Sequence, residues 1–430
     1  ELASSKYDGK RQVHRGYLPE RGKMIATLDP NVYPSFASWS LNEKDARGVI
    51  SDNVQNEMSA YLTLTYTLNN AYSFNFNTRA DASNKFGDRS NEKILPVWSV
   101  SASWDMKANI LRNVNWVNGL SVRASFGYQG NMLSNQTPEL IIKKGNMNDY
   151  FGEYESNIEH YPNPNLRWEK VEAWEVGAEA NFFRNRLHFE GVYYKKTTKN
   201  LLAEVPGISG TVPGIGNLGS IENKGVEIAL NWRDQIGDWG YNIGGNLTTI
   251  KNKVLSLVQE GYSIIAGDKS QSYTMAGYPI GYFYGYKVEG IYQTQEEINS
   301  SPKNTLATVT PGDLKFVDVN GDGEITTADR TMIGDPTPDV SYGITLGVSY
   351  KNWDLGIDMM GQAGNQIYRT WDNYNWSQFN FMEQRMDRWH GPGTSNTQPL
   401  LNTKHTINNL NSEYYIEDGS FFRIRNISLA

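Results

Sequence analysis

The sequence predicts an all-β protein: part of a transmembrane antiparallel β-barrel with long extracellular loops. Three observations predict this fold class. Apolar and polar residues alternate along most of the chain, in segments of about 10 residues, the length that a tilted membrane strand needs. Aromatic residues concentrate at the ends of these segments, as in the girdles of membrane barrels. The connections are alternately short and long, like periplasmic turns and extracellular loops.

Composition excludes several other classes. The 430 residues carry a mild formal net charge of -7, which gives no basic footprint for nucleic acid. The chain has no cysteine, so it has no disulfides, thiolate metal sites or Cys nucleophiles. No apolar run reaches the ~18 residues of a membrane helix. A barrel is compatible with these facts, because apolar and polar residues alternate along its strands and the average hydropathy stays low.

The first hairpin is predicted from residues 61–68 and 71–77, "YLTLTYTL" and "AYSFNFN". Each has one apolar and one polar face, and both residues of Asn69-Asn70 tolerate the positive φ of a two-residue turn. The same alternation is found at 98–105, 119–128, 173–183, 187–194, 225–232, 239–247, 341–350 and 353–360. Short turns are expected near Arg184-Asn185, from Arg233 to Asp238, and at Lys351-Asn352.

The apolar face could meet lipid or a second sheet of a large soluble all-β protein. Strand length, aromatic position and loop asymmetry favour lipid, and a closed barrel leaves no open edge. The girdle residues are Trp98, Trp104, Tyr128, Trp174, Trp232, Trp239, Tyr350 and Trp353. The long connections are about 78–96, 130–170, 196–224, 250–340 and 361–420, all on the extracellular side.

Residues 318–329, "DVNGDGEITTAD", are similar to the calcium loop of an EF-hand but are not flanked by helical patterns. A structural Ca²⁺ would take side-chain oxygens of Asp318, Asn320, Asp322 and Asp329 and the backbone carbonyl of Glu324. Asp329 is shorter than the usual twelfth-position Glu, so such a site would be weak. The alternative is a loop that folds without metal through Asx turns and glycines.

Residues 369–390 form another aromatic and polar outer segment. Its aromatic residues, together with Tyr284, could stack on sugar rings or contact a lid protein; the alternative is a small core within the loop. The candidate contact residues are Trp371, Tyr374, Trp376 and Tyr284.

The residues predict no catalytic site. Glu153, Glu155 and Glu159 could suggest a glycosidase pair, but a solvated polar loop explains them better. The five histidines lack metal-ligand spacing, and neither a Gly-x-Ser-x-Gly elbow nor a P-loop occurs. We therefore expect no enzyme activity.

Several linked segments resemble the SusC/RagA-type TonB-dependent outer-membrane transporters. The resemblance runs through most of the chain. It rests on Asn163 to Leu202, on Asn217 to Asn231 ("NLGSIENKGVEIALN"), on "GYPIGYFYGYKVEGIYQ" followed by "PGDLKFVDVNGDGEITTADRTMIGDPTPDVSYGI", and on "EDGSFFRIRNISLA" near the end.

This resemblance implies one barrel domain of about 22 strands, of which residues 1–430 are part, with a plugged lumen. It implies integral location in the bacterial outer membrane and active import of oligosaccharides or peptides, with a SusD-like lipoprotein as the lid and TonB as the source of energy. The plug, TonB box and final strands are expected to lie outside this sequence, and 251–340 is expected to be a long extracellular loop region. The alternative is a secreted or surface-anchored β-rich glycan-binding module that does not transport.

Overall fold

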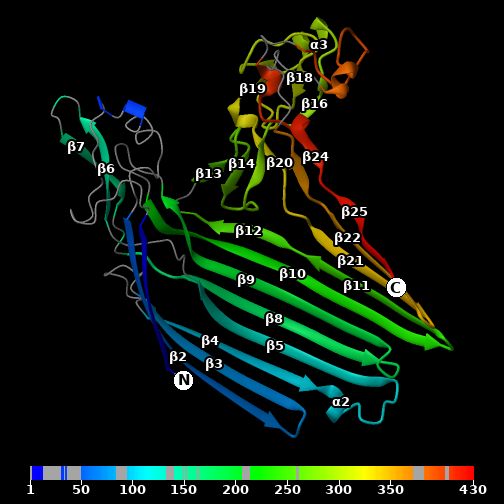
Figure 1. Cartoon of the computed structure of the whole chain (residues 1–430). Helices are drawn as coiled ribbons and strands as arrows, with labels where there is room; N and C mark the ends of the chain where they lie inside the picture. Colours follow the sequence, from blue (N-terminus) through cyan, green and yellow to red (C-terminus); the bar gives the residue numbers. More distant parts are fainter. Residues whose placement is uncertain are drawn as a thin grey trace.

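The computed structural model describes residues 2–12, 31–32, 34–35, 50–83, 94–131, 140–148, 150, 153–161, 163, 165–205, 214–257, 261–370, 382–401 and 406–430. Its main element is one curved 13-stranded sheet in which every neighbouring pair is antiparallel (Figure 1). Along the sheet the strands follow the order β1-β2-β3-β4-β5-β8-β9-β10-β11-β21-β22-β25. The remaining strand, β12, pairs with residues 220–224 of β10.

The strands of this sheet are long. They are β1 (Leu2–Gln12), β2 (Ile50–Leu68), β3 (Tyr72–Ser83), β4 (Ile94–Asp105), β5 (Val117–Asn131), β8 (Glu169–Phe182), β9 (Leu187–Val205), β10 (Gly214–Ile236), β11 (Trp239–Thr249), β12 (Lys251–Ser256), β21 (Val340–Tyr350), β22 (Trp353–Ala363) and β25 (Phe421–Leu429). All the predicted alternating segments are strands, and they pair in the expected hairpins.

The short turns all lie at one end of the sheet. Asn69 and Asn70 both have positive φ (55° and 52°), which confirms the predicted two-residue turn between β2 and β3. Arg184 and Asn185 between β8 and β9, and Lys351 between β21 and β22, are also left-handed, as a tight hairpin requires. The β4–β5 connection at this end contains a single helical turn, α2 (Met106–Asn109), which the alternation did not predict.

Two predictions about strand limits were wrong. The turn expected from Arg233 to Asp238 is only Gly237-Asp238, because β10 continues to Ile236 and pairs with Trp239. The long connection expected at 196–224 is mostly strand, because β9 runs to Val205 and β10 starts at Gly214. Strands of up to 23 residues therefore replace the predicted length of about 10, and Trp174 lies inside β8 instead of at its end.

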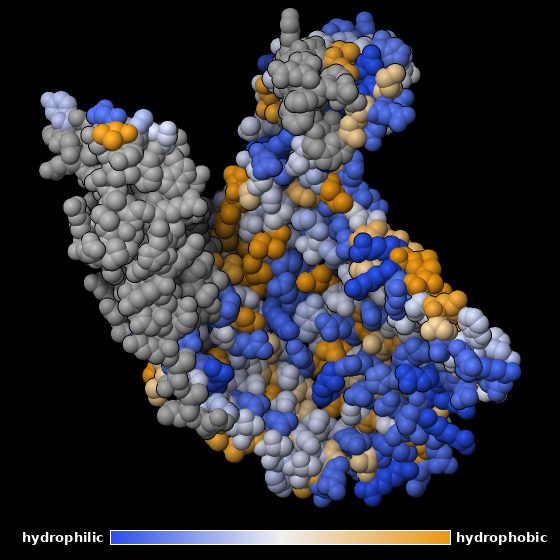
Figure 2. Space-filling view, in the orientation of Figure 1, coloured by the Kyte–Doolittle hydropathy of each residue, from blue (hydrophilic) through white to orange (hydrophobic). Residues whose placement is uncertain are grey.

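The two faces of the sheet differ in chemistry. On the apolar face, the side chains of Leu62, Leu64 and Tyr66 are 50%, 55% and 63% exposed. On the polar face, Thr65 donates to Asn75 (2.8 Å), and Asn75 donates to Ser101 (3.2 Å), across neighbouring strands. Figure 2 shows hydrophilic residues predominating over the face of the sheet turned to the viewer, with hydrophobic patches among them.

A second body lies at the end of the sheet opposite the short turns (Figure 1). We call it the loop subdomain: residues 263–334 together with 366–370, 382–401 and 406–418. Its elements are β13 (Ser263–Ala266), β14 (Ser272–Met275), β15 (Tyr282–Gly285), β16 (Val288–Ile291), α3 (Gln295–Ser300), β17 (Lys303–Asn304), β18 (Leu314–Phe316), β19 (Glu324–Ile325), β20 (Thr331–Gly334), β23 (Gln366–Tyr368), β24 (Ile416–Asp418) and the 3-10 turns Thr327–Asp329, Glu383–Asp387, Ile407–Asn409 and Glu413–Tyr415.

The loop subdomain has its own hydrophobic core. Tyr286 stacks on Phe316 with ring centroids 4.8 Å apart, and Leu314, Ile325 and Ile407 beside them are almost completely buried. The core joins segments that are distant in sequence: the backbone N–H of Leu314 donates to the side chain of Asn408 (2.8 Å). Within the predicted connections 250–340 and 361–420, the described residues 263–334, 366–370, 382–401 and 406–418 thus fold into one packed unit, while β12 belongs to the main sheet.

A separate hairpin, β6 (Ile141–Asn148) with β7 (Glu153–His160), extends from the same end of the sheet, within the predicted connection 130–170 (Figure 1). Among the described residues, no helix has both the length and the apolar character needed to cross a membrane.

Candidate functional site

The loop at 318–329 is held by hydrogen bonds from its own backbone. Asp318 accepts the N–H groups of Gly321 (2.7 Å) and Gly323 (2.8 Å), one on each carboxylate oxygen. The Asn320 side chain accepts from Asp322 N–H, and that of Asp322 accepts from Glu324 N–H, both at 2.9 Å. These are Asx-type contacts, in which a short polar side chain takes the place of a backbone partner.

The loop glycines allow this conformation. Gly321 and Gly323 have φ of 77° and 86°, in the left-handed region that side chains with a Cβ rarely adopt. No long helix flanks the loop: Glu324 pairs in parallel with Lys303, and a 3-10 turn begins at Thr327. Ile325 is fully buried in the core of the subdomain, as expected of the apolar anchor of such a loop.

Asp329, the twelfth residue of the loop, is fully buried and anchors the whole turn. One oxygen accepts from the backbone N–H of Val319 (2.9 Å) and Asn320 (3.4 Å), and the other from Thr326 N–H (2.7 Å). Burial alone would raise the pKa of Asp329, but these N–H groups together outweigh it and keep the pKa below its ordinary value. The carboxylate is therefore ionised and already fully engaged by the backbone.

The donor set fits a weak cation site at best. Within the described part of the chain, no group of three or more His, Asp or Glu side chains is arranged to hold a metal ion. Asp318, Asn320, Asp322 and the carbonyl of Glu324 still present the oxygen types that Ca²⁺ prefers, at the spacing of a calcium loop. Asp329 supports the loop from behind, because it is fully buried, whereas Asp318 is only partly buried and Asn320 and Asp322 are exposed.

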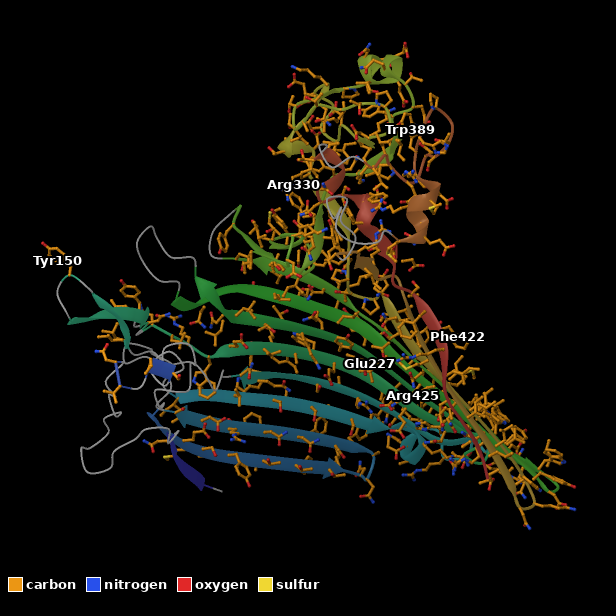
Figure 3. All side chains as sticks on the ribbon, turned by 45° about the horizontal axis from the view of Figure 1, so that its top comes forward. Tyr150, Glu227, Arg330, Trp389, Phe422 and Arg425 are labelled. Atoms are coloured by element: carbon orange, nitrogen blue, oxygen red, sulfur yellow. The ribbon has the colours of Figure 1, made fainter. Side chains whose placement is uncertain are left out.

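Tyr284 lies in a cluster of aromatic rings at the base of the loop subdomain. Its ring centroid is 4.4 Å from that of Tyr273, and the guanidinium of Arg330 lies 4.7 Å from the Tyr284 ring. Arg330 also donates to the Tyr273 hydroxyl (3.1 Å). Figure 3 places Arg330 at this base and Trp389 farther out in the subdomain. Tyr284 is thus packed by its neighbours and only partly accessible to a ligand.

Neighbouring Tyr282 is buried, and this burial raises the pKa of its hydroxyl to about 12. Trp371, Tyr374 and Trp376 lie outside the described residues. The alternation and motifs of the sequence did not indicate Arg330 as a partner of Tyr284. An arginine directly after the twelve-residue loop is the signal that could have indicated it, because arginine pairs readily with aromatic faces.

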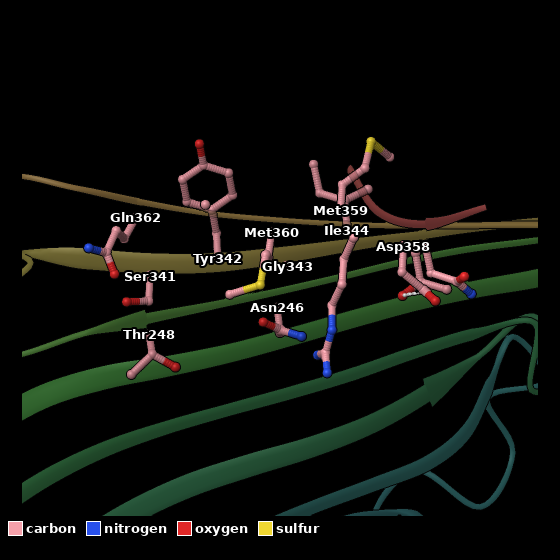
Figure 4. A pocket seen from close by; sticks show the side chains of 14 residues that line it. Asn246, Thr248, Ser341, Tyr342, Gly343, Ile344, Asp358, Met359, Met360 and Gln362 are labelled. Atoms are coloured by element: carbon pink, nitrogen blue, oxygen red, sulfur yellow. Dashed lines mark hydrogen bonds between the residues drawn. The ribbon is translucent and has the colours of Figure 1, made fainter. Parts of the chain in front are cut away.

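The polar face of the sheet carries a shallow groove across β11, β21, β22 and β25, with a volume of about 660 Å³. Figure 4 shows Tyr342, Ile344 and Met359 pointing to one side of these strands, and Ser341, Gln362 and Asn246 to the other. The polar groups that line the groove include Asn246, Thr248, Ser341, Thr345, Asp358, Gln362, Arg425 and Asn426.

This groove can hydrogen-bond a polar ligand or another polar segment. Its charged side chains are Asp358, which accepts a hydrogen bond from Thr345 (3.2 Å), and Arg425, the extra residue at a bulge in β25. Elsewhere the polar face carries ion pairs: Arg123 with Glu190 (2.7 Å) and Lys196 with Glu175 (3.4 Å). These groups suit contact with a ligand and its positioning, and no motif in the sequence indicated them.

Comparison with known proteins agrees with this architecture. Residues 26–359 match the family described as TonB dependent receptor-like, beta-barrel. The chain is 30% identical to TonB-dependent receptor P3 of Formosa agariphila over 426 residues, 91% of this chain and 41% of that protein. It is 26% identical to TonB-dependent receptor SusC of Bacteroides thetaiotaomicron, over 86% of this chain and 37% of SusC.

The solved structures that share the fold include the RagAB peptide transporter. That match has a TM-score of 0.74 and 22% identity, and covers 89% of this chain and 41% of the other. The chain thus spans about 40% of the length of the curated relatives it matches. Because the family match covers most of the sequence, from β2 to β22, the chain belongs to the TonB-dependent receptor β-barrel family, with SusC among its relatives.

Proposed function

We propose that this chain forms part of the barrel wall of an active importer in the bacterial outer membrane. It would import oligosaccharides or peptides together with a SusD-like surface lipoprotein and would be energised by TonB. Its activity would be gated transport, in which no covalent bond of the substrate is made or broken. The receptors and transporters among its relatives support this proposal.

One observation carries the membrane placement. The main sheet leaves large apolar side chains exposed over one face, in the part nearer to the short turns, while the opposite face is hydrogen-bonded and charged. An exposed apolar patch that extends across several strands is rare on soluble monomers. Lipid on the apolar face and a wet lumen on the polar face account for both surfaces.

The substrate class stays open between two alternatives. The described RagAB structures are those of a peptide transporter, whereas the aromatic residues of the outer segments suit stacking on sugar rings. We propose Trp371, Tyr374, Trp376 and Tyr284 as contacts for the substrate or the lipoprotein lid. Specificity would then reside at the loop end of the barrel, where the loop subdomain lies (Figure 1).

An uptake experiment tests the proposal. Cells that produce the protein are given labelled oligosaccharides and labelled peptides, with and without TonB. TonB-dependent accumulation of one class, and recovery of the protein only with detergent, is the expected result. A monomer that is soluble without detergent and binds glycans without transport would contradict the proposal and favour a surface binding module.

We also propose that the loop at 318–329 takes a weak structural Ca²⁺ through Asp318, Asn320, Asp322 and the carbonyl of Glu324. Extracellular modules bind Ca²⁺ with a Kd of about 10⁻⁴–10⁻³ M, and this site should lie in that range. Its expected role is to fix the loop.

The metal is tested by limited proteolysis at the loop, with millimolar Ca²⁺ or with chelator. Ca²⁺ should protect the wild-type loop and fail to protect the Asp318→Ala/Asp322→Ala variant. Asp335→Ala, just beyond the motif, is the control and should keep the protection. Equal cleavage of the wild-type loop with and without Ca²⁺ would contradict the proposed Ca²⁺ site.

A further inference from the structure

We propose that a belt of six lysines on the apolar face binds the phosphate groups of lipid headgroups in the outer leaflet. This inference rests on the outer-membrane placement proposed above. The lysine belt consists of Lys170, Lys195, Lys199, Lys224, Lys251 and Lys253, on the neighbouring strands β8, β9, β10 and β12.

Strand register places all six lysines on the apolar face. Residues directly opposite in an antiparallel pair share a face, and alternate residues along a strand share it too. Trp174 stands opposite Lys195, Lys195 opposite Lys224, and Lys224 opposite Lys251. The row therefore begins at an exposed aromatic residue of the apolar face and continues as lysine across three strands.

The pairing of the same strands places the other lysines of the belt on this face. Lys170 stands opposite Lys199, and Lys253 stands opposite Glu222. Lys196, one residue from Lys195, points to the other face, where it pairs with Glu175. The lysines of the belt are therefore distinct from the charges of the polar face.

Four of the six lysines lie at one height above the short turns, while Lys195 lies four residues nearer to the turn end and Lys253 two residues farther from it. Each of these four lysines is twelve residues along the chain from the outermost apolar residue at its turn end. The pairs are Lys170 and Phe182, Lys199 and Leu187, Lys224 and Ile236, and Lys251 and Trp239. Twelve residues span ~41 Å of strand, or ~29 Å along the barrel axis at a tilt of about 45°. The apolar band of a membrane barrel is about 25 Å tall, so the lysines stand at its upper edge.

The cross-strand arrangement would be unfavourable without an anion. Like charges directly opposite each other destabilise a sheet, yet lysine faces lysine at Lys170–Lys199, Lys195–Lys224 and Lys224–Lys251. Two acidic residues lie among the lysines of the belt on the same face. Glu222 pairs with Lys195 (3.0 Å) and Lys224 (3.3 Å).

Glu172 pairs with Lys199 (2.9 Å). Six lysines and two glutamates leave a local charge of +4 in a chain whose net charge is -7. The side chains of Lys195, Lys199 and Lys224 are still 43–52% exposed. A phosphate-bearing ligand complements this excess charge, and the outer-leaflet headgroups lie at this height.

Aromatic residues continue the surface towards the apolar band. The ammonium group of Lys170 lies 4.3 Å from the Tyr128 ring centroid, and Phe126 packs against Trp174 at 4.1 Å. Below them a groove of about 720 Å³ is lined by apolar side chains such as Val100 and Val176. Acyl chains can occupy this groove while the phosphates meet the lysines above it.

The belt is tested with the protein purified in detergent from the cell envelope. Binding is measured in micelles that contain lipid A or enzymatically dephosphorylated lipid A. Wild-type protein should prefer the phosphorylated form, and Lys199→Gln/Lys224→Gln/Lys251→Gln should lose at least about tenfold in affinity for it, since each lysine near an anionic surface contributes about fivefold. Lys196→Gln/Lys303→Gln/Lys351→Gln removes the same charge away from the belt and should bind like wild type.

Folding is checked by the mobility of the unheated protein in gels, and the single variant Lys251→Gln, with an expected fall of about fivefold, serves if the triple variant does not fold. Excess inorganic phosphate should not displace the lipid, because the acyl chains also bind; displacement would overturn a lipid as the occupant. Equal affinity for both lipids would also overturn the inference. So would a triple variant that keeps its affinity for lipid A but loses a protein that co-purifies with the wild type. A detergent-dependent envelope protein without lipid preference would refute the belt and leave the importer proposal standing, whereas a soluble protein would refute the importer proposal itself.

Discussion

Asp329 shows how one short side chain changes the chemistry of a motif. A glutamate at the twelfth position of a calcium loop reaches the cation with both oxygens. Asp329 instead gives both oxygens to the N–H groups of Val319, Asn320 and Thr326. The loop is therefore held from within, and any bound cation adds to a turn that is already folded.

Replacing Asp329 with alanine should unfold the loop locally. The change leaves buried N–H groups without an acceptor, which costs about 2–3 kcal/mol for bonds to a charged partner. We expect faster proteolysis within 318–329 while the main sheet stays folded. The control is Glu324→Gln, which keeps the backbone carbonyl and changes a half-exposed side chain. Equal cleavage of both variants would contradict the anchoring role.

The same carboxylate makes the loop sensitive to acid. Because the folded pKa of Asp329 lies below its ordinary value of 3.8, its contribution to stability is complete above about pH 4. It is lost as the pH falls through the lower folded pKa. Pepsin should therefore begin to cleave the loop only at pH values below 4. A loop that opens on titration between pH 5 and 7 would exclude Asp329 as the cause.

At the scale of single elements, strands on which one face is buried or lipid-facing were predictable. A period of two and left-handed turn residues such as Asn69-Asn70 define the β2–β3 hairpin completely. The sequence did not predict the outer halves of β9 and β10. Those halves include residues 214–224, "GIGNLGSIENK", where glycine and polar residues obscure the alternation although the backbone still pairs. Pairing there is enforced by the neighbouring strand and not by a contrast between faces.

A charge on the apolar face should block assembly. Leu64 lies four residues from the end of β2, about 10 Å along the axis from the turn end and close to the middle of the apolar band. Leu64→Arg should destabilise the barrel by about 2–4 kcal/mol and lower its yield in the membrane. Thr65→Arg, the next residue on the polar face, should assemble normally. Equal loss in both variants would show that the two faces do not differ in environment.

At the scale of the whole molecule, the fold of the main sheet was predictable and the loop subdomain was not. Its core joins Leu314 to Asn408 and Tyr286 to Ser412 across about a hundred residues, and local patterns carry no information on such contacts. The candidate loop at 318–329 was visible as a motif. Its anchor Asp329 and the pairing of Arg330 with Tyr284 depend on this tertiary packing, so only the structure indicates them.

The central claim is that the apolar face of the main sheet contacts lipid and the polar face contacts water. Since the chain contains no cysteine, single cysteines can be placed at each position from 61 to 68 and spin-labelled in a bilayer. Accessibility to oxygen should be high, and that to a water-soluble nickel chelate low, at 62, 64, 66 and 68, with the reverse at 61, 63, 65 and 67. Labels at 62, 64, 66 and 68 that neither reagent reaches would show a face packed against a second layer of protein and contradict the account.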